Sequence, residues 1–243
     1  ITQYRLYFKM NIADVFFRLH MPVTPLEYTT KMMAAAQERG VKLVIGEVLG
    51  LQIEEDGSED GVVTGVHVNG LEDVLQADKV VIAMGPWSIM AEEWLPGVKV
   101  PLEGVKSTSL VYPATGKVAE EPFALFCGED VNGCHLEVYP RPTGEVYICG
   151  CGGSDYVTAA RLRPGGDCES ANEIGADPRR VAAASRSFAG LAPSVAMEGD
   201  NSVEPMSQAC MRPCAPDALP ILGQAPGYKG AYLACGHNCW GIL

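Results

Sequence analysis

The sequence predicts an α/β protein in two parts: a doubly wound domain that lacks its first half, and an α+β domain built on an antiparallel sheet. Three observations lead to this prediction. A helix precedes several strand-like segments in 1–101, short apolar strands alternate with turns in 102–206, and a strand and a glycine-rich turn close 207–243. We therefore expect 1–101 and 207–243 to form the doubly wound domain, and 102–206 to form the other.

The doubly wound domain opens with a helix signal. Thr24 is expected to cap the helix, with Pro25 at its first position and Glu27 completing a capping box. Gly40 is expected to end it. Strand-like segments follow at 41–45, 48–53, 62–68 and 78–84, whereas residues 1–20 show no clear hydrophobic periodicity. This order is typical of the second half of a doubly wound fold.

The middle region combines short strands with one long helix. Strands are expected at 106–112, 124–127, 135–139 and 145–149, with a proline-containing turn at 140–144. The segment 178–191 has a helical pattern, because its apolar residues recur at spacings of three and four: Val181, Ala184, Phe188 and Leu191. A mostly antiparallel sheet with a flanking helix is therefore expected here.

The C-terminal region reads as strand, turn, strand and a second turn. Residues 212–217 have turn chemistry, because proline fixes φ and aspartate can bond its own backbone. The apolar run 231–234, bounded by Gly230 and Gly236, suits a buried strand. Gly236 and Gly241 then allow the backbone to approach a flat or charged ligand closely.

Composition excludes several classes of protein. The 243 residues are 47% hydrophobic and 20% charged, as in a globular chain, and the net charge of −12 argues against nucleic acid as a partner. No apolar run is as long as a membrane span. Nine cysteines without a C-x-x-C pair predict no metal site and reduced thiols in an intracellular, cytoplasmic protein. Organellar targeting stays open, because the N-terminus is expected to be missing.

Two strings carry a family resemblance. Arg212-Pro-x-x-Pro-Asp-x-x-Pro-x-x-Gly223 precedes a strand and then Gly236-His-x-x-x-Gly-Ile242. This arrangement resembles the C-terminal FAD-binding segment of the DAO family, the FAD-dependent oxidoreductases that include D-amino-acid oxidase, glycine oxidase and sarcosine oxidase. The resemblance implies FAD as cofactor. It also implies a flavin-lining turn of five residues: Gly236, His237, Asn238, Gly241 and Ile242.

A second region supports the same resemblance. Residues 80–88 resemble the family's V-V-x-A-x-G-x-W-S turn, which implies that Gly85 and Trp87 lie beside the cofactor. Met84 and Pro86 depart from the smaller residues common there, which puts the detailed contact in doubt. Val48 matches the valine whose backbone meets the adenine ring in the family.

The resemblance covers only the C-terminal portion of the family's chain. The G-x-G-x-x-G turn that would hold the FAD pyrophosphate is absent, and the glycine-rich segment 150–155 has Asp155 where its last glycine should stand. We therefore expect an incomplete FAD/NAD(P)-binding doubly wound domain, without its first ADP-binding half, beside an antiparallel-sheet substrate domain.

The implied chemistry is oxidation of a small amino acid or amine by hydride transfer to flavin. Arg212 matches the arginine that holds a substrate carboxylate in the family, and Glu137 stands in the substrate pocket where a tyrosine is common. A carboxylate there would repel an acidic group and favour a cationic one. Cys210 matches a cysteine that links flavin covalently in sarcosine oxidase, and segment 144–150 lacks that enzyme's oxygen-activating lysine.

Several alternatives stay open at this point. The electron acceptor is either oxygen or another molecule, and the flavin is covalent or not. The chain is alternatively a non-catalytic interaction module with the same fold, or a flavin dehydrogenase for a substrate that is not an amine. The predicted partner is a small-molecule substrate, and the sequence predicts no oligomeric state.

Overall fold

The computed structural model describes residues 24–55, 57, 60–114, 118, 123–198 and 201–241 of the chain. Within these ranges it contains two compact units. Unit 1 comprises residues 24–41, 107–154 and 174–210, and unit 2 comprises 42–106, 155–173 and 211–241. Strands β5 (Glu103–Tyr112) and β12 (Met206–Cys214) contribute residues to both units.

Unit 1 is organised around an antiparallel sheet. Its strands follow the order β12-β5-β8-β7-β6, in which β6 is Leu125–Phe126, β7 is Glu137–Pro140 and β8 is Val146–Cys149. The register pairs Val138 with Ile148 and Leu110 with Ile148. All four strands predicted in the middle region are present, although three of them are shorter than expected. The predicted antiparallel sheet is thus confirmed.

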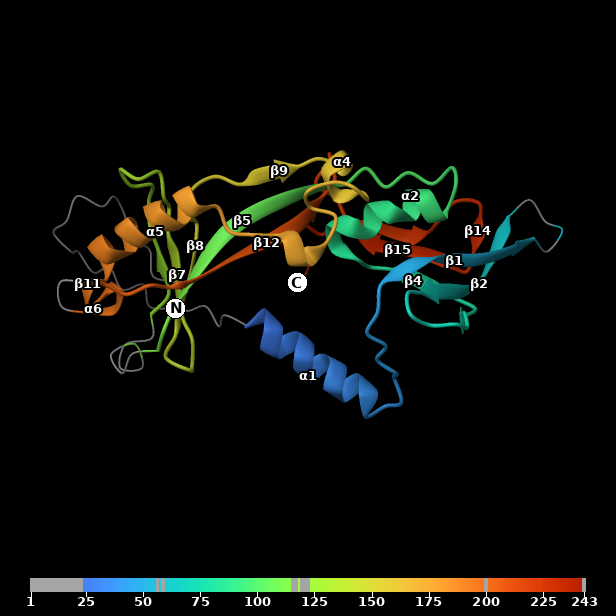
Figure 1. Cartoon of the computed structure of the whole chain (residues 1–243), viewed down its shortest axis with the longest axis horizontal. Coiled ribbons are helices and arrows are strands. Elements are labelled where there is room, and N and C mark those ends of the chain that lie inside the picture. Colours follow the sequence, from blue (N-terminus) through green and yellow to red (C-terminus); the bar gives the residue numbers. More distant parts are fainter. Residues whose placement is uncertain are drawn as a thin grey trace, which may run out of the picture. The chain divides into compact units, whose positions relative to one another are not determined.

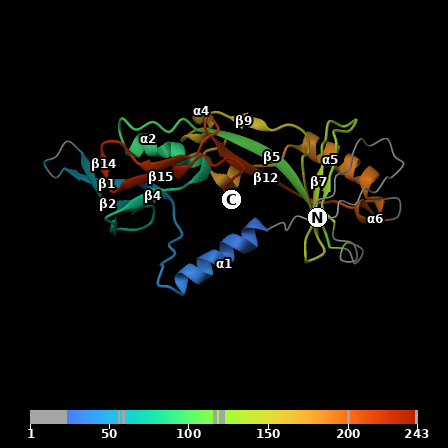
Figure 2. The same cartoon turned by 180° about the vertical axis from the view of Figure 1, so that it is seen from behind.

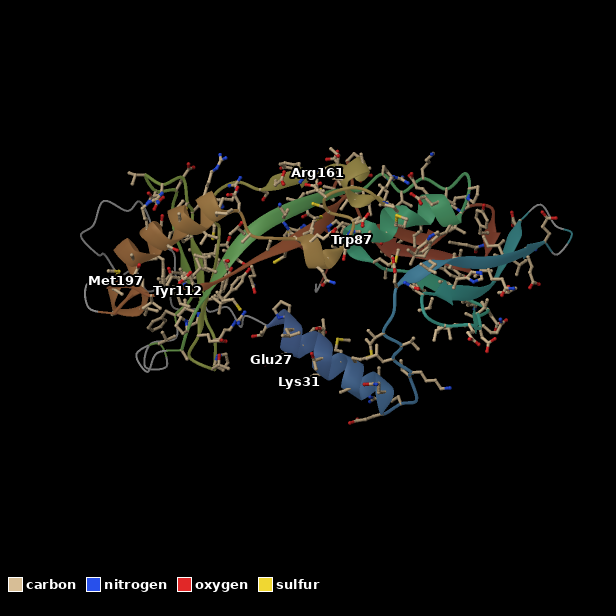
Figure 3. All side chains as sticks on the ribbon, viewed as in Figure 1. Glu27, Lys31, Trp87, Tyr112, Arg161 and Met197 are labelled. Atoms are coloured by element: carbon tan, nitrogen blue, oxygen red, sulfur yellow. The ribbon has the colours of Figure 1, made fainter. Side chains whose placement is uncertain are left out.

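Helix α5 (Pro178–Leu191) covers one face of this sheet and has the bounds predicted from the sequence. Its residues Ala184 and Phe188 are buried in one apolar cluster with Leu110 and Ile148 (Figure 1). The Phe188 ring lies 4.7 Å from the ring of Tyr112, which is labelled in Figure 3. The three-and-four spacing therefore marks the side of α5 that faces the sheet.

Asp177 caps α5, because its side chain accepts a hydrogen bond from the Arg179 backbone N–H at 2.8 Å. This bond holds the pKa of Asp177 below its ordinary value. The stabilisation is therefore present at neutral pH and is lost as the pH falls through the lowered pKa.

We expect Asp177→Asn to keep the cap but to lose this pH dependence, since an amide oxygen accepts the same bond without titrating. The urea midpoint of the wild type should then fall more steeply on acidification than that of the variant. Parallel pH profiles of the two proteins would show that Asp177 does not couple protonation to folding.

Unit 1 also contains helix α1 (Pro25–Gln37), none of whose residues is buried. The helix is present as predicted, but the capping box is not, because Thr24 makes no side-chain cap bond. Gly40 follows with φ of 92°, in the left-handed conformation expected at a helix end. The remaining elements, α6 (Pro193–Ala196), β10 (Met197–Glu198) and β11 (Asn201–Ser202), form a short helix and hairpin.

Unit 2 contains two small sheets. The first joins β1 (Val48–Glu55), β2 (Gly61–Val68), β3 (Leu75–Gln76) and β14 (Tyr228–Lys229). The second has the order β13-β15-β4, with β13 at Ile221–Gln224, β15 at Ala231–Cys235 and β4 at Val80–Ile82. Strand β15 runs antiparallel to β13 and parallel to β4, and Figure 2 shows β15 beside β4.

Short helical segments and ion pairs close unit 2. The 3₁₀ helix η1 (Gly85–Met90) and helix α2 (Ala91–Trp94) follow β4. The buried apolar cluster of unit 2 includes Ile82, Leu95 and Leu233. Strand β9 (Asp155–Val157) pairs with β5, and α4 (Ala159–Leu162) and η2 (Ala171–Glu173) come next. Arg163 bonds Glu92 and Glu93 of α2 at 2.7 Å each.

Two predicted strands differ from the structure. Residues 41–45 are exposed and form no strand, and β4 has three residues instead of the seven expected, with Val81 60% exposed. A strand requires a hydrogen-bonded neighbour. In the described part of the chain, 41–45 has none and β4 pairs with β15 alone. No helix within that part is long and apolar enough to cross a membrane.

Candidate functional site

The parallel strands β4 and β15 bring two predicted cofactor turns to one edge of a sheet. Val80 pairs with Ala231 and Ile82 with Leu233, so both strands end at the same side. Gly85 follows the end of β4, and Gly236 follows the end of β15. The carboxyl ends of parallel strands are where α/β sheets bind ligands.

Both glycines need their lack of a side chain. Gly85 has φ of 56° and Gly236 has φ of 78°, in the region that L residues rarely adopt. A Cβ added to Gly85 would meet nothing within 4 Å, so this turn leaves open space beside the backbone. A Cβ on Gly236 would instead lie 3.4 Å from Leu102 Cδ2, so this second glycine packs against the core.

The turn after β15 is fixed to β12. The Asn238 backbone N–H donates to Pro213 O at 2.9 Å, and Cys214 and His237 form an antiparallel bridge. Asn238 has φ of 50°, and its Nδ2 lies 3.8 Å from Cys214 Sγ. Its Oδ1 is buried and accepts no hydrogen bond within the described part of the chain. A buried amide oxygen without a donor is a place where a ligand N–H would fit.

The same bridge places the turn beside Pro213 and Cys214 of β12, and Arg212 directly precedes them in that strand. Arg212 is partly buried, and none of the ion pairs among the described residues involves it. Gly241 is exposed, and a Cβ built on it would lie 3.6 Å from His237 Cβ. Ile242 lies outside the described residues.

Trp87 and Val48 are placed differently from the two turns. The Nε1–H of Trp87, which is labelled in Figure 3, donates to Cys168 O at 3.0 Å, so the polar edge of this ring is already bound within unit 2. Val48 lines a groove of about 380 Å³ together with Val80 and Val81, near the start of β4. Neither Gly85 nor Gly236 lines that groove. The structure thus gathers Gly85, the turn after β15 and Arg212, and sets Val48 apart.

In unit 1, Glu137 lies on a sheet face with other polar residues. The register pairs Glu137 with Cys149 and Tyr139 with Tyr147, so these four side chains share a face. The Tyr139 hydroxyl donates to Glu137 Oε2 at 2.6 Å, and the Cys149 thiol donates to the same oxygen at 3.6 Å. Glu137 therefore lies at the centre of a hydrogen-bonded group.

Burial and the charge of Glu137 act together on its neighbours. Burial first, and then the Glu137 carboxylate, raise the pKa of the Tyr139 hydroxyl and of the Cys149 thiol above their ordinary values. Burial also raises the pKa of Tyr147. These three groups are therefore protonated at neutral pH, and two of them, Tyr139 and Cys149, donate to Glu137. The sequence interpretation named only Glu137, although alternation along the predicted strands 135–139 and 145–149 is the signal that would have found the others.

Glu137→Gln should lower the pKa of the Cys149 thiol, because removing the carboxylate removes one of the causes that raise it. We expect faster alkylation of Cys149 at alkaline pH, followed by peptide mass spectrometry. Cys151 is the internal control: burial and Cys134 raise its pKa to about 12, and Glu137 does not contribute. Equal labelling of Cys149 in both proteins would contradict the coupling.

Comparison with known proteins adds to this geometry. The model of the family "FAD dependent oxidoreductase" (DAO) matches residues 12–243. Glycine oxidase of Pseudomonas putida is 29% identical over 185 residues, which are 76% of this chain and 42% of that protein. The chain thus spans about half the length, or less, of the relatives that it matches.

Two solved structures illustrate the fold. L-proline dehydrogenase from P. horikoshii superposes with a TM-score of 0.61 at 18% identity, over 90% of this chain and 51% of that one. Glycine oxidase from Bacillus cereus superposes with a TM-score of 0.54 at 20% identity, over 89% of this chain and 51% of that one. The predicted fold, incomplete relative to these proteins, is confirmed.

Proposed function

Because this chain belongs to the DAO family of FAD-dependent oxidoreductases, we propose that it takes part in oxidising a small amino acid or amine by hydride transfer to flavin. The observation that carries the proposal is the edge at which β4 and β15 end, with Gly85 and the turn after β15 side by side in the sheet register. We assign residues 1–101 and 207–243 to the cofactor domain and 102–206 to the substrate domain.

The residues at this edge fit a flavin. The open side of Gly85 gives a planar group room against the backbone, and the buried Oδ1 of Asn238 offers an acceptor to a ring N–H. We propose that Gly236, His237 and Gly241 complete this surface, together with Ile242. Trp87 supports the Gly85 turn from within, and Val48 would meet a more distant part of the cofactor. When bound, FAD supplies the hydride acceptor.

The chain's own residues would bind and orient the substrate. Arg212 holds the carboxylate in a bidentate pair, which fixes the carbon that loses hydride. Glu137 lies in the substrate pocket, with the Tyr139 hydroxyl holding its Oε2 in place. No acid or base is required in the transfer when the amine arrives neutral, so orientation does most of the catalytic work.

FAD titration of the purified chain, followed by quenching of tryptophan fluorescence, tests the first half of the proposal. Anaerobic addition of amino acids and amines to the flavin-loaded chain tests the second, since a substrate bleaches the flavin absorption. A folded chain that takes up no FAD and captures a stoichiometric protein partner would favour an interaction module instead. If only compounds without an amine bleach the flavin, the chain is better explained as a flavin dehydrogenase for a substrate that is not an amine.

Asn238→Gly should weaken FAD binding about tenfold, because it removes the amide oxygen without straining a backbone at positive φ. The measurement is the same fluorescence titration. Leu222→Ala, at a side chain that is 64% exposed on β13, is the control, and the melting temperatures of the two variants should be compared alongside. An unchanged dissociation constant for Asn238→Gly would remove this residue from the cofactor site.

A further inference from the structure

The face of the unit 1 sheet opposite α5 has an unusual composition. Val138 and Ile148 point into the cluster beneath α5, so their neighbours in the strands point to the other side. Phe126 of β6 pairs with Glu137, which places it on that other side as well. We call this set the aromatic-acid face, and its members are Phe126, Glu137, Tyr139 and Tyr147.

The rings of this face stand close together around the carboxylate. Phe126 and Tyr139 meet edge to face, with ring centroids 5.8 Å apart at 90°, and the centroids of Tyr139 and Tyr147 are 6.1 Å apart. The Arg141 guanidinium already lies over the Tyr147 ring, 5.5 Å from its centroid. A cation is thus accommodated at the border of the face.

Arg141 forms its ion pair with Glu145 and not with Glu137. Arg141 pairs with Glu145 at 3.3 Å, and Glu137 forms no ion pair within the described part of the chain. The hydrogen bonds that Glu137 accepts come from Tyr139 and Cys149, which are neutral, and both reach Oε2. Glu137 thus has two hydrogen-bond donors and no cationic partner among the described residues.

A buried hydroxyl lies on the same side of the sheet. Ser109 of β5 is 2% exposed, and its side chain interacts with the Tyr147 hydroxyl. This contact holds the Tyr147 ring against the strand, because buried hydroxyls are usually paired. A carboxylate without a cationic partner among the described residues and three rings therefore share one side of the sheet.

We propose that the aromatic-acid face binds an organic cation, and that the substrate carries a protonated or alkylated nitrogen in addition to the amine that is oxidised. Glu137 supplies the charge, and the rings of Tyr139 and Phe126 supply cation–π contacts. The assignment of this cation to a substrate rests on the proposed function, whereas the binding site itself does not.

Tetramethylammonium tests the site without any flavin chemistry. We expect isothermal titration calorimetry of the purified chain to show binding that Glu137→Gln weakens about tenfold and Tyr139→Leu weakens several-fold. Glu129→Gln, which removes an exposed carboxylate from the same unit, should leave binding unchanged. Circular dichroism checks that each variant is folded. Equal binding by the wild type and Glu137→Gln, or loss of binding in Glu129→Gln as well, would overturn the proposal.

Lysine and norleucine then test the assignment to a substrate, because they differ in the distal ammonium group. The flavin-loaded wild type should prefer lysine about tenfold in kcat/KM, and Glu137→Gln should lose this preference. If neither is oxidised but tetramethylammonium binding depends on Glu137, the site stands and the proposed function fails. If norleucine is oxidised as well as lysine and tetramethylammonium does not bind, the proposed function stands and the cation site fails.

Discussion

Replacing Arg212 with alanine is expected to raise the KM for an amino-acid substrate about a hundredfold. A bidentate arginine–carboxylate pair contains two charge-assisted hydrogen bonds, and losing both costs about 3 kcal/mol, which corresponds to roughly a hundredfold. Arg212 is partly buried on β12, directly before the proline whose carbonyl accepts from Asn238. The substitution would therefore remove a substrate contact next to the turn that we assign to the cofactor.

Two controls separate this effect from misfolding. Arg212→Lys keeps the charge but not the planar fork, so its KM should rise by a smaller factor. An amine substrate that lacks the carboxylate should be oxidised equally well by the wild type and Arg212→Ala. Steady-state kinetics with such a matched pair of substrates make the measurement. If Arg212→Ala changes the kinetics of both substrates alike, the arginine does not bind the carboxylate.

Replacing Phe188 with alanine is expected to destabilise the protein by about 3–5 kcal/mol. The side chain is 1% exposed and lies between α5 and the sheet, against Tyr112. Truncation removes its buried area and leaves a cavity that the surrounding strands fill only partly. Urea unfolding followed by circular dichroism gives the free energy of unfolding for each variant.

Matched substitutions define the scale of this effect. Phe188→Leu should cost distinctly less, since it keeps most of the apolar volume. Leu222→Ala, at a side chain that is 64% exposed on β13, should change the free energy by less than about 0.5 kcal/mol. A loss below about 1 kcal/mol for Phe188→Ala would mean that α5 does not depend on this contact.

Local patterns predicted the elements that carry their own signal. Helix α5 was predicted to the residue, because its apolar spacing is contained in the segment itself. The strand at 41–45 was predicted wrongly, and β4 was predicted too long. A strand depends on a neighbour that its own residues do not specify, and the described chain supplies none to 41–45.

The candidate site was predicted unevenly for a similar reason. Its glycines, Arg212 and Glu137 were predicted from a family resemblance, because short sequence motifs are enough to show such a resemblance. Tyr139, Tyr147 and Cys149 were missed, because their grouping depends on the register of β7 with β8. The buried, unpartnered Oδ1 of Asn238 also emerges only from three-dimensional packing, since the bridge between Cys214 and His237 sets its surroundings.

The protonated state of Cys149 has a chemical consequence for the whole sheet face. Peroxides convert cysteine to sulfenic acid by attack of the thiolate, and a thiol whose pKa is raised by burial and by an adjacent carboxylate contains almost none of that form. An enzyme that passes its electrons to oxygen would release hydrogen peroxide beside its own substrate. Burial and Glu137 together would then protect the Cys149 sulfur from oxidative damage.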